Sequence, residues 1–559
     1  MLDHLSRPLV EPDSRAERLV ASALMAVGVG LRIAQYLANR SLWGDEVAIA
    51  LNLRLRSFHE LLHPLSYDQT MPFGLLLVLK AFGSGFGYSE WVLRLPLLLA
   101  GCALILLAWF LFARLFEQRV VFVFVALLAI SEPLIYYAGE VKQYGLDALV
   151  ALIMLWLGLN TLKKETSASW PRLIVGGIGA LLFSQPVVFI LAGIGGAAVW
   201  DRRFRTSRQW RKYVMLAGAL WIVIFGLLYW FSYREVSHNV FMRAYWEPKF
   251  IHLHSSAFRH DIAAALVLLL GEDQILHVPR YLLAALFLAG IFGIARKMGG
   301  AVAVLAGLPF LLVVLASALQ EYPLVVRLVL FLSPILFWIY ATGLSTLADF
   351  VPEKSSNLAF AVLALLFVAP SVPQAWHFRQ REGTRDVVRK IEAQNDPETV
   401  YLVFGHYTPW EYYAGDWAHP ERVRERIDRA ARCLRAAQLT YALERDNPGG
   451  GCSPLEFPAD GRRPEEIVGT PPPGPWAGNS ADEQWLEQEA HRIREAQTPL
   501  IWLFLPDEAN HFTYGFPERR KLLERLEGEL SREGCRLLER DREGETRAIE
   551  MQCFAGTHS

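Results

Sequence analysis

The sequence predicts a polytopic α-helical membrane protein of about eleven transmembrane helices, with interfacial helices and a C-terminal soluble α/β domain. Two observations predict this fold class. Of the 559 residues, 53% are hydrophobic, and nearly all the long apolar runs lie before residue 375. Most of the charge lies after that residue, in a segment long enough for one soluble domain. We therefore expect a membrane domain at 1–374 and a soluble domain at 375–559.

Each expected span is a run of mainly apolar residues, and about 20 of them cross a bilayer as a helix. The runs lie at 18–38, 91–113, 119–137, 143–162, 172–184, 186–200, 213–231, 280–296, 300–319, 325–346 and 357–374. The fifth and sixth runs are short. The apolar stretch 71–86 is also short and contains Lys80, so we expect it in or near the outer interface. Arg15 and Arg18 precede the first run, and no clear cleavage site follows it, so we expect this span to be retained.

Basic residues predict the orientation, because short cytoplasmic loops are enriched in Lys and Arg. The segments expected on the cytoplasmic side are Arg114 to Arg119, Lys163–Lys164, Asp201 to Lys212 and Arg296–Lys297. The loops that hold Asp45, Lys142 and Arg327 then fall on the outer face. The odd number of spans leaves the C-terminal domain outside as well.

The adjacent carboxylates Asp45 and Glu46 lie where the first span emerges. Ionisable residues at membrane depth are costly, which makes them functional candidates, and a carboxylate pair suits general-base or cation-binding chemistry. A structural helix end in the headgroup zone is the alternative. Glu46 to His63 has apolar residues at helical spacing, which predicts a helix in the interface plane, with a packed loop helix as the alternative.

Two further outer loops carry charges. Glu140, Lys142 and Tyr144 precede or open one span, and Arg327 opens another. Tyr and Lys at a span end also serve as interfacial anchors, which is the alternative for the first group. A guanidinium group binds phosphate bidentately, so Arg327 suits a phosphate headgroup. If the three loops meet, their residues suit group transfer from a phospholipid-linked donor whose apolar tail lies between spans.

Five segments, taken in chain order, resemble the GT-C superfamily of membrane glycosyltransferases. The relevant branch contains protein O-mannosyltransferases and the lipid A aminoarabinose transferase (glycosyltransferase family 39-like). The resemblance covers most of residues 18–346 and, more loosely, the C-terminal domain. The segments are Trp43-Gly-Asp-Glu46, Pro72 leading an apolar helix, Gly87 to Pro96, Glu140-Val-Lys-Gln-Tyr144 and Tyr322-Pro-Leu-Val-Val-Arg327.

The resemblance implies an inverting transfer of a sugar from a polyprenyl-phosphate-linked donor to an acceptor hydroxyl on the periplasmic or lumenal face. It implies that Asp45 is the general base toward the acceptor, while Glu46 helps to hold the loop or a cation. Lys142 and Arg327 would bind the donor phosphate and stabilise the leaving group. Residues expected to support the site are Asp68, Gln69, Arg94, Glu140 and Tyr144.

This chain departs from the family pattern at two places. Relatives carry a carboxylate or His before the proline near the end of the first loop, often for metal or acceptor handling. Here the run is Tyr67-Asp-Gln-Thr-Met-Pro72, in which Asp68 is an approximate match. A divalent cation held by Glu46 and Asp68 is therefore left open as a cofactor. Lys142 stands where relatives often have Arg, which preserves the charge but loses the bidentate fork.

The C-terminal segment alternates helical patterns with apolar strand patterns, which is typical of an α/β layer. We expect helices at 385–394, 409–414, 485–496 and 519–533, strands at 399–404, 500–505, 535–539 and 547–553, and loop at 447–475. Four of the five cysteines lie here, and on an outer face they permit disulfides. Of the three possible pairings we favour Cys433–Cys452 with Cys535–Cys553. His406 and His511 follow strands, and we interpret them as ordinary loop residues rather than acceptor contacts.

The expected partners are the polyprenyl-phosphate-sugar donor, a lipid, glycan or protein acceptor, and membrane lipids. The formal net charge of −1 gives no support for nucleic-acid binding. We expect a multi-pass protein of the bacterial inner membrane with a periplasmic C-terminal domain. A transporter is the rival hypothesis, although the charges cluster at one face, and a non-catalytic scaffold of the same fold is the third. Substitution of Asp45 separates them, because only an enzyme would lose turnover.

Overall fold

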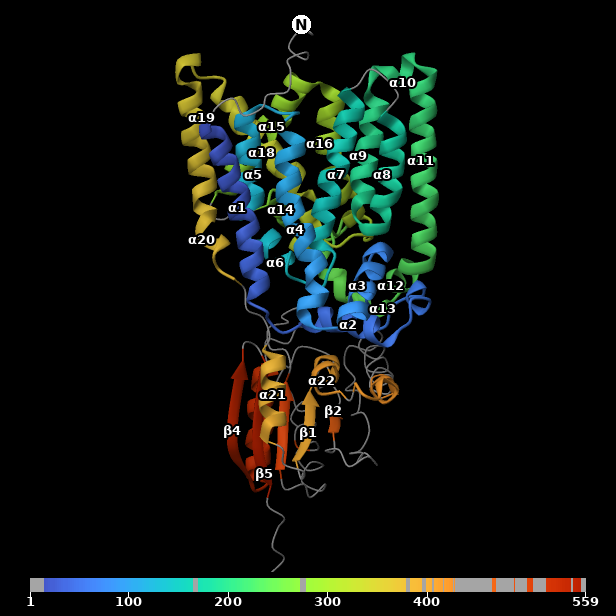
Figure 1. Ribbon diagram of the computed structural model, residues 1–559, viewed down its shortest axis with the longest axis vertical. Coiled ribbons are helices and arrows are strands. Elements are labelled where there is room, and N and C mark those ends of the chain that lie inside the picture. Colours follow the sequence, from blue (N-terminus) through green and yellow to red (C-terminus); the bar gives the residue numbers. More distant parts are fainter. Residues whose placement is uncertain are drawn as a thin grey trace, which may run out of the picture. The chain divides into compact units, whose positions relative to one another are not determined.

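The computed structural model in Figure 1 describes most of the chain up to residue 378 and parts of the remainder. The described residues are 15–163, 169–271, 278–378, 383–394, 399–404, 407–415, 417–425, 427, 465–468, 487, 500–505, 519–543 and 546–553. The chain forms two compact units. Unit 1 comprises residues 1–39, 70–234 and 246–379, and unit 2 comprises residues 40–69, 235–245 and 380–559. The first outer loop thus clusters with the C-terminal segment.

The chain is a multi-pass membrane protein, because eight of its described helical segments are long and apolar enough to cross a bilayer. They are α1 (Arg15–Leu37), α4 (Glu90–Phe112), α7 (Tyr144–Lys163), α11 with its extension (Arg208–Ser237), α15 (Arg280–Met298), α16 (Gly300–Ala318), α17–α18 (Val326–Ala348) and α19–α20 (Lys354–Ala375). Four apolar helices are shorter: α3 (Phe73–Phe86), α5 (Gln118–Ile130), α8 (Trp170–Phe183) and α9 (Val187–Trp200). Each of the eleven expected spans coincides with one of these helices. Three of them, α5, α8 and α9, are shorter than the roughly 20 residues that cross a bilayer.

The remaining described helices are short or belong to the loops. They are α2 (Gly44–Leu55), α6 (Glu132–Tyr137), α10 (Arg202–Thr206), α12 (Arg234–Ser237), α13 (Val240–Trp246), α14 (Phe258–Leu269), α21 (Thr384–Gln394), α22 (Tyr407–Ala414) and α25 (Arg519–Arg532). Residues on nearly all sides of α2 are buried. A helix in the interface plane would leave one face in water, so the packed loop helix is the correct interpretation of this segment.

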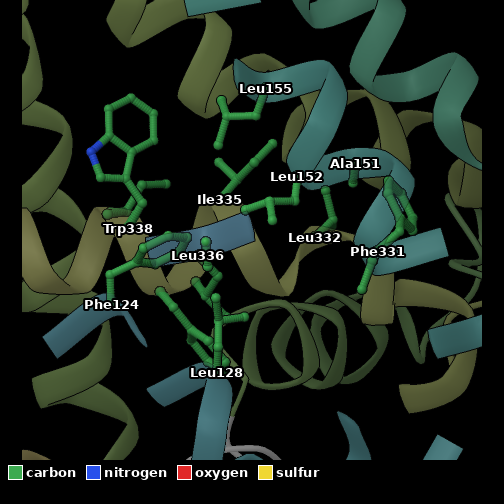
Figure 2. Close-up of a cluster of buried hydrophobic side chains, with 14 of the residues drawn as sticks. Phe124, Leu128, Ala151, Leu152, Leu155, Phe331, Leu332, Ile335, Leu336 and Trp338 are labelled. Carbon is green, nitrogen blue, oxygen red and sulfur yellow. The ribbon is translucent and has the colours of Figure 1, made fainter. Parts of the chain in front are cut away.

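The core of unit 1 lies where α18 (Ser333–Ala348) packs between α5 and α7, as Figure 2 shows. Phe124 and Leu128 of α5 and Leu152 and Leu155 of α7 contribute side chains with little or no exposed surface. Trp338 belongs to the same cluster. A helix that is apolar on all sides needs neighbours on all sides, which explains why α18 is buried along nearly its whole length.

The loops with the expected cytoplasmic charges lie together at one end of unit 1, which we call the basic end. Lys297, at the end of α15, contacts Glu117 (3.0 Å) and Asp349 (2.9 Å), and Arg119 at the start of α5 also pairs with Asp349. Lys163, at the end of α7, donates to the carbonyl of Leu115 (3.0 Å). These contacts join the ends of four spans and agree with the alternation on which the predicted orientation depends.

Unit 2 contains a five-stranded sheet in the order β2-β1-β3-β5-β4. The strands are β1 (Thr399–Phe404), β2 (Glu465–Val468), β3 (Leu500–Leu505), β4 (Cys535–Glu543) and β5 (Thr546–Cys553). β1 pairs in parallel with β2 and β3, whereas β5 pairs antiparallel with β3 and β4. The structure has a strand at each of the four expected positions, and β4 and β5 pair as the expected terminal hairpin. The prediction of a loop at 447–475 is wrong for Glu465–Val468, which form β2. A four-residue edge strand is too short to be recognised by its apolar pattern in a segment rich in Gly and Pro.

Candidate functional site

Asp45 lies in the first turn of α2, in unit 2. The preceding residue Trp43 has an extended backbone (φ −91°, ψ 169°), so the helix begins abruptly at Gly44. Between residues 41 and 53, which the structure describes completely, Asp45 is the one residue that is not buried. The amide end of a helix dipole stabilises negative charge in the first turn. The local fold therefore presents a single carboxylate of this segment to solvent.

The end of the first outer loop returns to Asp45. Gln69 directs its Nε2 atom to Oδ1 of Asp45 at 3.4 Å and to the carbonyl oxygen of Tyr67 at 3.1 Å. Tyr67 and Asp68 have φ values of 67° and 54°, a left-handed conformation that L-residues rarely adopt and that often marks a functional site. Asp68 in turn accepts a hydrogen bond from Asn239 Nδ2 at 2.7 Å. Gln69 is thus the predicted supporting residue that the structure places next to Asp45.

Glu46 has a different environment from its neighbour. Its side chain is fully buried, and its Oε2 atom accepts from the Trp43 backbone N–H at 3.3 Å and lies 3.7 Å from Arg40 Nη1. A carboxylate that accepts a backbone N–H at a helix start stabilises that start. Of the two expected roles for Glu46, these contacts support holding the loop.

The donor set here does not fit a cation site. Glu46 contacts Arg40 and a backbone amide, and Asp68 accepts from Asn239. Across the described residues, His, Cys, Asp and Glu side chains form no group of three or more that could hold a metal. Divalent cations such as Mg²⁺ and Ca²⁺ need several oxygen ligands arranged around one point. Glu46 and Asp68, with these partners, do not provide such a set of ligands.

The second outer loop belongs to unit 1 and carries two buried charged residues. The side chains of Glu140 and Lys142 are 0% and 4% exposed, and the Lys142 N–H donates to the Glu140 carbonyl at 2.7 Å in a tight turn. α7 then starts close against α6, because a Cβ on Gly145 would lie 2.9 Å from the Tyr137 carbonyl oxygen. Buried ionisable groups at a membrane-domain loop are typical of functional sites.

Arg327, at the start of the α17–α18 span, lies between two aromatic rings of unit 1. Its guanidinium carbon is 5.9 Å from the ring centre of Tyr144 and 5.7 Å from that of Trp246. Such distances allow cation–π attraction. The loop before Arg327 is fixed by Tyr322, which donates to the Leu328 carbonyl at 2.6 Å, and by the Leu324 N–H, which donates to the Lys249 carbonyl at 2.9 Å. The structure therefore brings Arg327 to Tyr144, as expected for the second and third loops.

Asp147 is a candidate that the sequence reasoning missed. It lies one turn into α7 and is 4% exposed, beside Ser184 at the break between α8 and α9. Burial, together with the nearby Asp147 carboxylate and Tyr144, raises the pKa of Tyr322 well above its usual value. The signal was available, because an Asp inside an apolar span is a functional candidate by default. In the sequence, Asp147 falls within the predicted span at 143–162.

The remaining predicted residues are Arg94 and the cysteines and histidines of the C-terminal segment. Arg94 of α4 is 2% exposed and lies near Tyr36 of α1, whose hydroxyl donates to the Trp91 carbonyl at 2.8 Å. Cys535 is disulfide-bonded, and Cys553 lies directly opposite it in the β4–β5 pair. That pairing stays a prediction with the strand register in its favour. Outside the described residues lie Cys433, Cys452, His406 and His511.

Part of the chain matches a known family in sequence. The family model described as dolichyl-phosphate-mannose-protein mannosyltransferase matches residues 70–230. That range holds the second outer loop and Asp147 but neither Asp45 nor Arg327. Comparison of the sequence with curated proteins gives no match.

Solved structures are similar in fold at low sequence identity. Apo ArnT from Cupriavidus metallidurans is 14% identical, with a TM-score of 0.50, and the match covers 96% of this chain and 98% of that one. The same protein bound to undecaprenyl phosphate is 12% identical, with a TM-score of 0.46, and that match covers 95% of this chain and 97% of the other.

The Archaeoglobus fulgidus oligosaccharyltransferase in complex with Zn and sulfate is 16% identical, with a TM-score of 0.46. That match covers 71% of this chain, and this chain spans 61% of that longer protein. The match to the family model and the fold shared with apo ArnT agree with the resemblance carried by the motifs. Residues 70–230 thus match a membrane mannosyltransferase family model, and the chain shares the fold of apo ArnT, both in keeping with the predicted resemblance to the GT-C superfamily.

Proposed function

We propose that this protein is an inverting glycosyltransferase that moves a sugar from a polyprenyl-phosphate-linked donor to an acceptor hydroxyl. The observation that carries the proposal is the isolation of Asp45 as the one non-buried residue of 41–53, oriented by Gln69. The family model supports the donor class, because its description names a dolichyl-phosphate-linked sugar. The outer face would be the periplasmic face of a bacterial inner membrane, with unit 2 in the periplasm.

The chemistry assigns one role to each charged group. The Asp45 carboxylate takes the proton of the acceptor hydroxyl while that oxygen attacks the anomeric carbon of the sugar. The bond between the anomeric carbon and the phosphate oxygen breaks, and the polyprenyl phosphate leaves with the electron pair. Attack on the side opposite the leaving group inverts the anomeric centre. Lys142 and Arg327 bind the phosphate and stabilise the charge that develops on it.

Arg327 suits this role because the rings of Tyr144 and Trp246 lie within cation–π distance of its guanidinium group and favour one position for it. Two aromatic rings flank its guanidinium group, and a pre-positioned charge costs no reorganisation when the bond breaks. Glu140, Tyr144 and Arg94 are proposed to support this phosphate site, and Gln69 and Asp68 the Asp45 side.

The test compares membranes that contain wild-type protein, Asp45→Asn protein or neither. Mass spectrometry of lipid extracts and envelope glycans should show a sugar-sized mass addition only with wild type, while the undecaprenyl-phosphate-linked donor accumulates in the others. Because positioned proton transfer contributes about 10²- to 10⁴-fold, Asp45→Asn should lose about that much turnover. Asp349→Asn, a carboxylate that pairs with Lys297 at the basic end, is the matched control and should retain turnover. Identical glycans for wild type and Asp45→Asn would overturn the assignment.

A further inference from the structure

The helix that carries Asp45 packs against a helix of the C-terminal segment. α2 and α22 both belong to unit 2 and lie side by side, as Figure 1 shows. α22 is itself well anchored, because Thr408, Trp410 and Glu411 are buried. These residues are separated from α2 by more than 350 positions in sequence, so the contact is a product of the tertiary fold.

Contacts from the C-terminal segment hold the chain just before α2. The Leu42 N–H donates to the hydroxyl of Tyr413 at 2.7 Å, and the Arg385 N–H donates to Oγ of Ser41 at 3.2 Å. Leu42 lies three residues before Asp45. Amide groups near a helix start need partners outside the helix, and Tyr413 supplies one of them.

A second set of contacts holds the other end of α2. The Arg54 guanidinium stacks over the ring of Trp417 at 3.5 Å from the ring centre, and Arg424 donates to the Leu55 carbonyl. Trp417 is tied back to α22, because its Nε1 donates to the Tyr412 carbonyl at 3.0 Å. Both ends of a twelve-residue helix are therefore contacted by residues 412–415 and 417–424.

We propose that residues 412–415 and 417–424 form a clamp that sets the orientation of α2, and that Tyr413 and Trp417 are positioning residues for Asp45. This inference rests on the proposed function, in which Asp45 is the base. Side chains extend a helix to a radius of about 5 Å, so a rotation of about 20° would move the carboxylate by roughly 2 Å. A misplacement of about 1 Å can cost a reaction about 10²-fold. A clamp at both ends prevents such rotation.

The test uses the full-length protein in detergent or nanodiscs. Tyr413→Phe removes one hydroxyl and keeps the ring, and Trp417→Leu removes the surface on which Arg54 stacks. The matched control is Tyr340→Phe, which removes a buried hydroxyl that donates to the Leu270 carbonyl at 2.6 Å in unit 1. Trp417→Phe keeps an aromatic surface and serves as the conservative rescue.

We expect kcat to fall about tenfold in Tyr413→Phe and Trp417→Leu, with recovery in Trp417→Phe. The dissociation constant for undecaprenyl phosphate should stay within twofold of wild type, because the phosphate residues are unchanged. Backbone amides of residues 43–55 should exchange with deuterium faster in both variants and not in Tyr340→Phe. Thermal stability should change by no more than it does in the control.

Two results would overturn the clamp. One is amide exchange in α2 that matches wild type in both variants. The other is a kcat loss no larger than that of Tyr340→Phe while Asp45→Asn is inactive, which would leave the proposed function standing. If Asp45→Asn keeps full turnover, the proposed function fails, and the catalytic purpose of the clamp fails with it.

Discussion

The two ends of unit 1 use charged residues in different ways. At the basic end, Glu117, Asp349, Arg119 and Lys297 are partly exposed and pair with one another. At the opposite end, which we call the outer end, Glu140 and Lys142 are buried, and Arg327 lies near two aromatic rings. Exposed pairs contribute little to stability, whereas burying charges costs several kcal/mol and usually accompanies function. The contrast is the one expected if, as proposed, the second set binds the donor phosphate while the first set only joins the ends of the spans.

Within unit 1, the largest expected effect comes from removing a phosphate-binding charge at the outer end. Arg327→Gln and Lys142→Gln should each lower turnover by about 10²- to 10³-fold, the usual cost of removing one group that stabilises developing charge. Arg327→Lys should recover part of the loss, because it restores the charge without the bidentate fork. Turnover is measured in reconstituted membranes with a polyprenyl-phosphate sugar.

Lys297→Gln is the matched control for that experiment, because it removes a cation at the basic end. It should turn over at the wild-type rate. Equal losses for Lys297→Gln and Arg327→Gln would show that the two ends do not differ in the way proposed.

Asp147→Asn should produce the next largest effect. The substitution keeps the size of a buried side chain and replaces its carboxyl group, which lies beside Ser184, with an amide. We expect turnover to fall about tenfold, or about 1.4 kcal/mol in activation free energy. Turnover within twofold of wild type, with normal expression, would make Asp147 a structural residue.

The outer end was also where sequence reasoning reached its limit. Apolar periodicity sufficed for the spans, and the order of motifs around Asp45, Lys142 and Arg327 pointed to the superfamily. Spacing could not show that Arg327 meets Tyr144, since more than 180 residues separate them. The sequence also could not show that Asp45 is accessible while its neighbour Glu46 is buried against Arg40. The burial of neighbouring residues in a helix depends on which other segments pack against each side of that helix.

The C-terminal segment gives the same lesson at the level of domains. Strands β1 and β3 are continuous apolar runs, which is typical of strands buried in a parallel sheet, and they were predicted at their observed bounds. The contact of α22 with α2 leaves no pattern in either segment. The expected boundary at residue 375 therefore separated the first outer loop from residues with which it clusters.

A smaller effect is expected at the basic end itself. Burial alone would raise the pKa of Glu117, but Lys297 and Arg119 hold it below its usual value. A depressed carboxyl pKa contributes stability above the unfolded-state pKa, which is lost as pH falls through the folded-state value. The Glu117→Gln and Lys297→Gln double-mutant cycle should give a coupling of about 0.2–1 kcal/mol near neutral pH. A coupling that persists unchanged at about pH 3 would contradict the pairing.

The smallest effect concerns a partly exposed cluster in the loop tied to the Arg327 segment. The hydrogen bond to Asp261 (2.9 Å) raises the pKa of His252, and Glu247 (3.3 Å) adds to the rise. A raised histidine pKa contributes stability that is complete below the unfolded-state value of about 6.5 and is lost as pH rises through the folded-state value. Near pH 6 the free energy of unfolding of the wild type should therefore exceed that of His252→Gln by about 0.5 kcal/mol or less.

That advantage should shrink toward about pH 9 as His252 loses its proton. Thermal unfolding of both proteins across this range is the measurement, with His260→Gln as the control, since the side chain of His260 is largely exposed and lies 3.6 Å from Asp261. An advantage that grows with pH would mean that neutral His252 is the stabilising form. The outer end would then hold its loop by hydrogen bonding alone, and paired exposed charges would be a feature of the basic end and not of the loop beside Arg327.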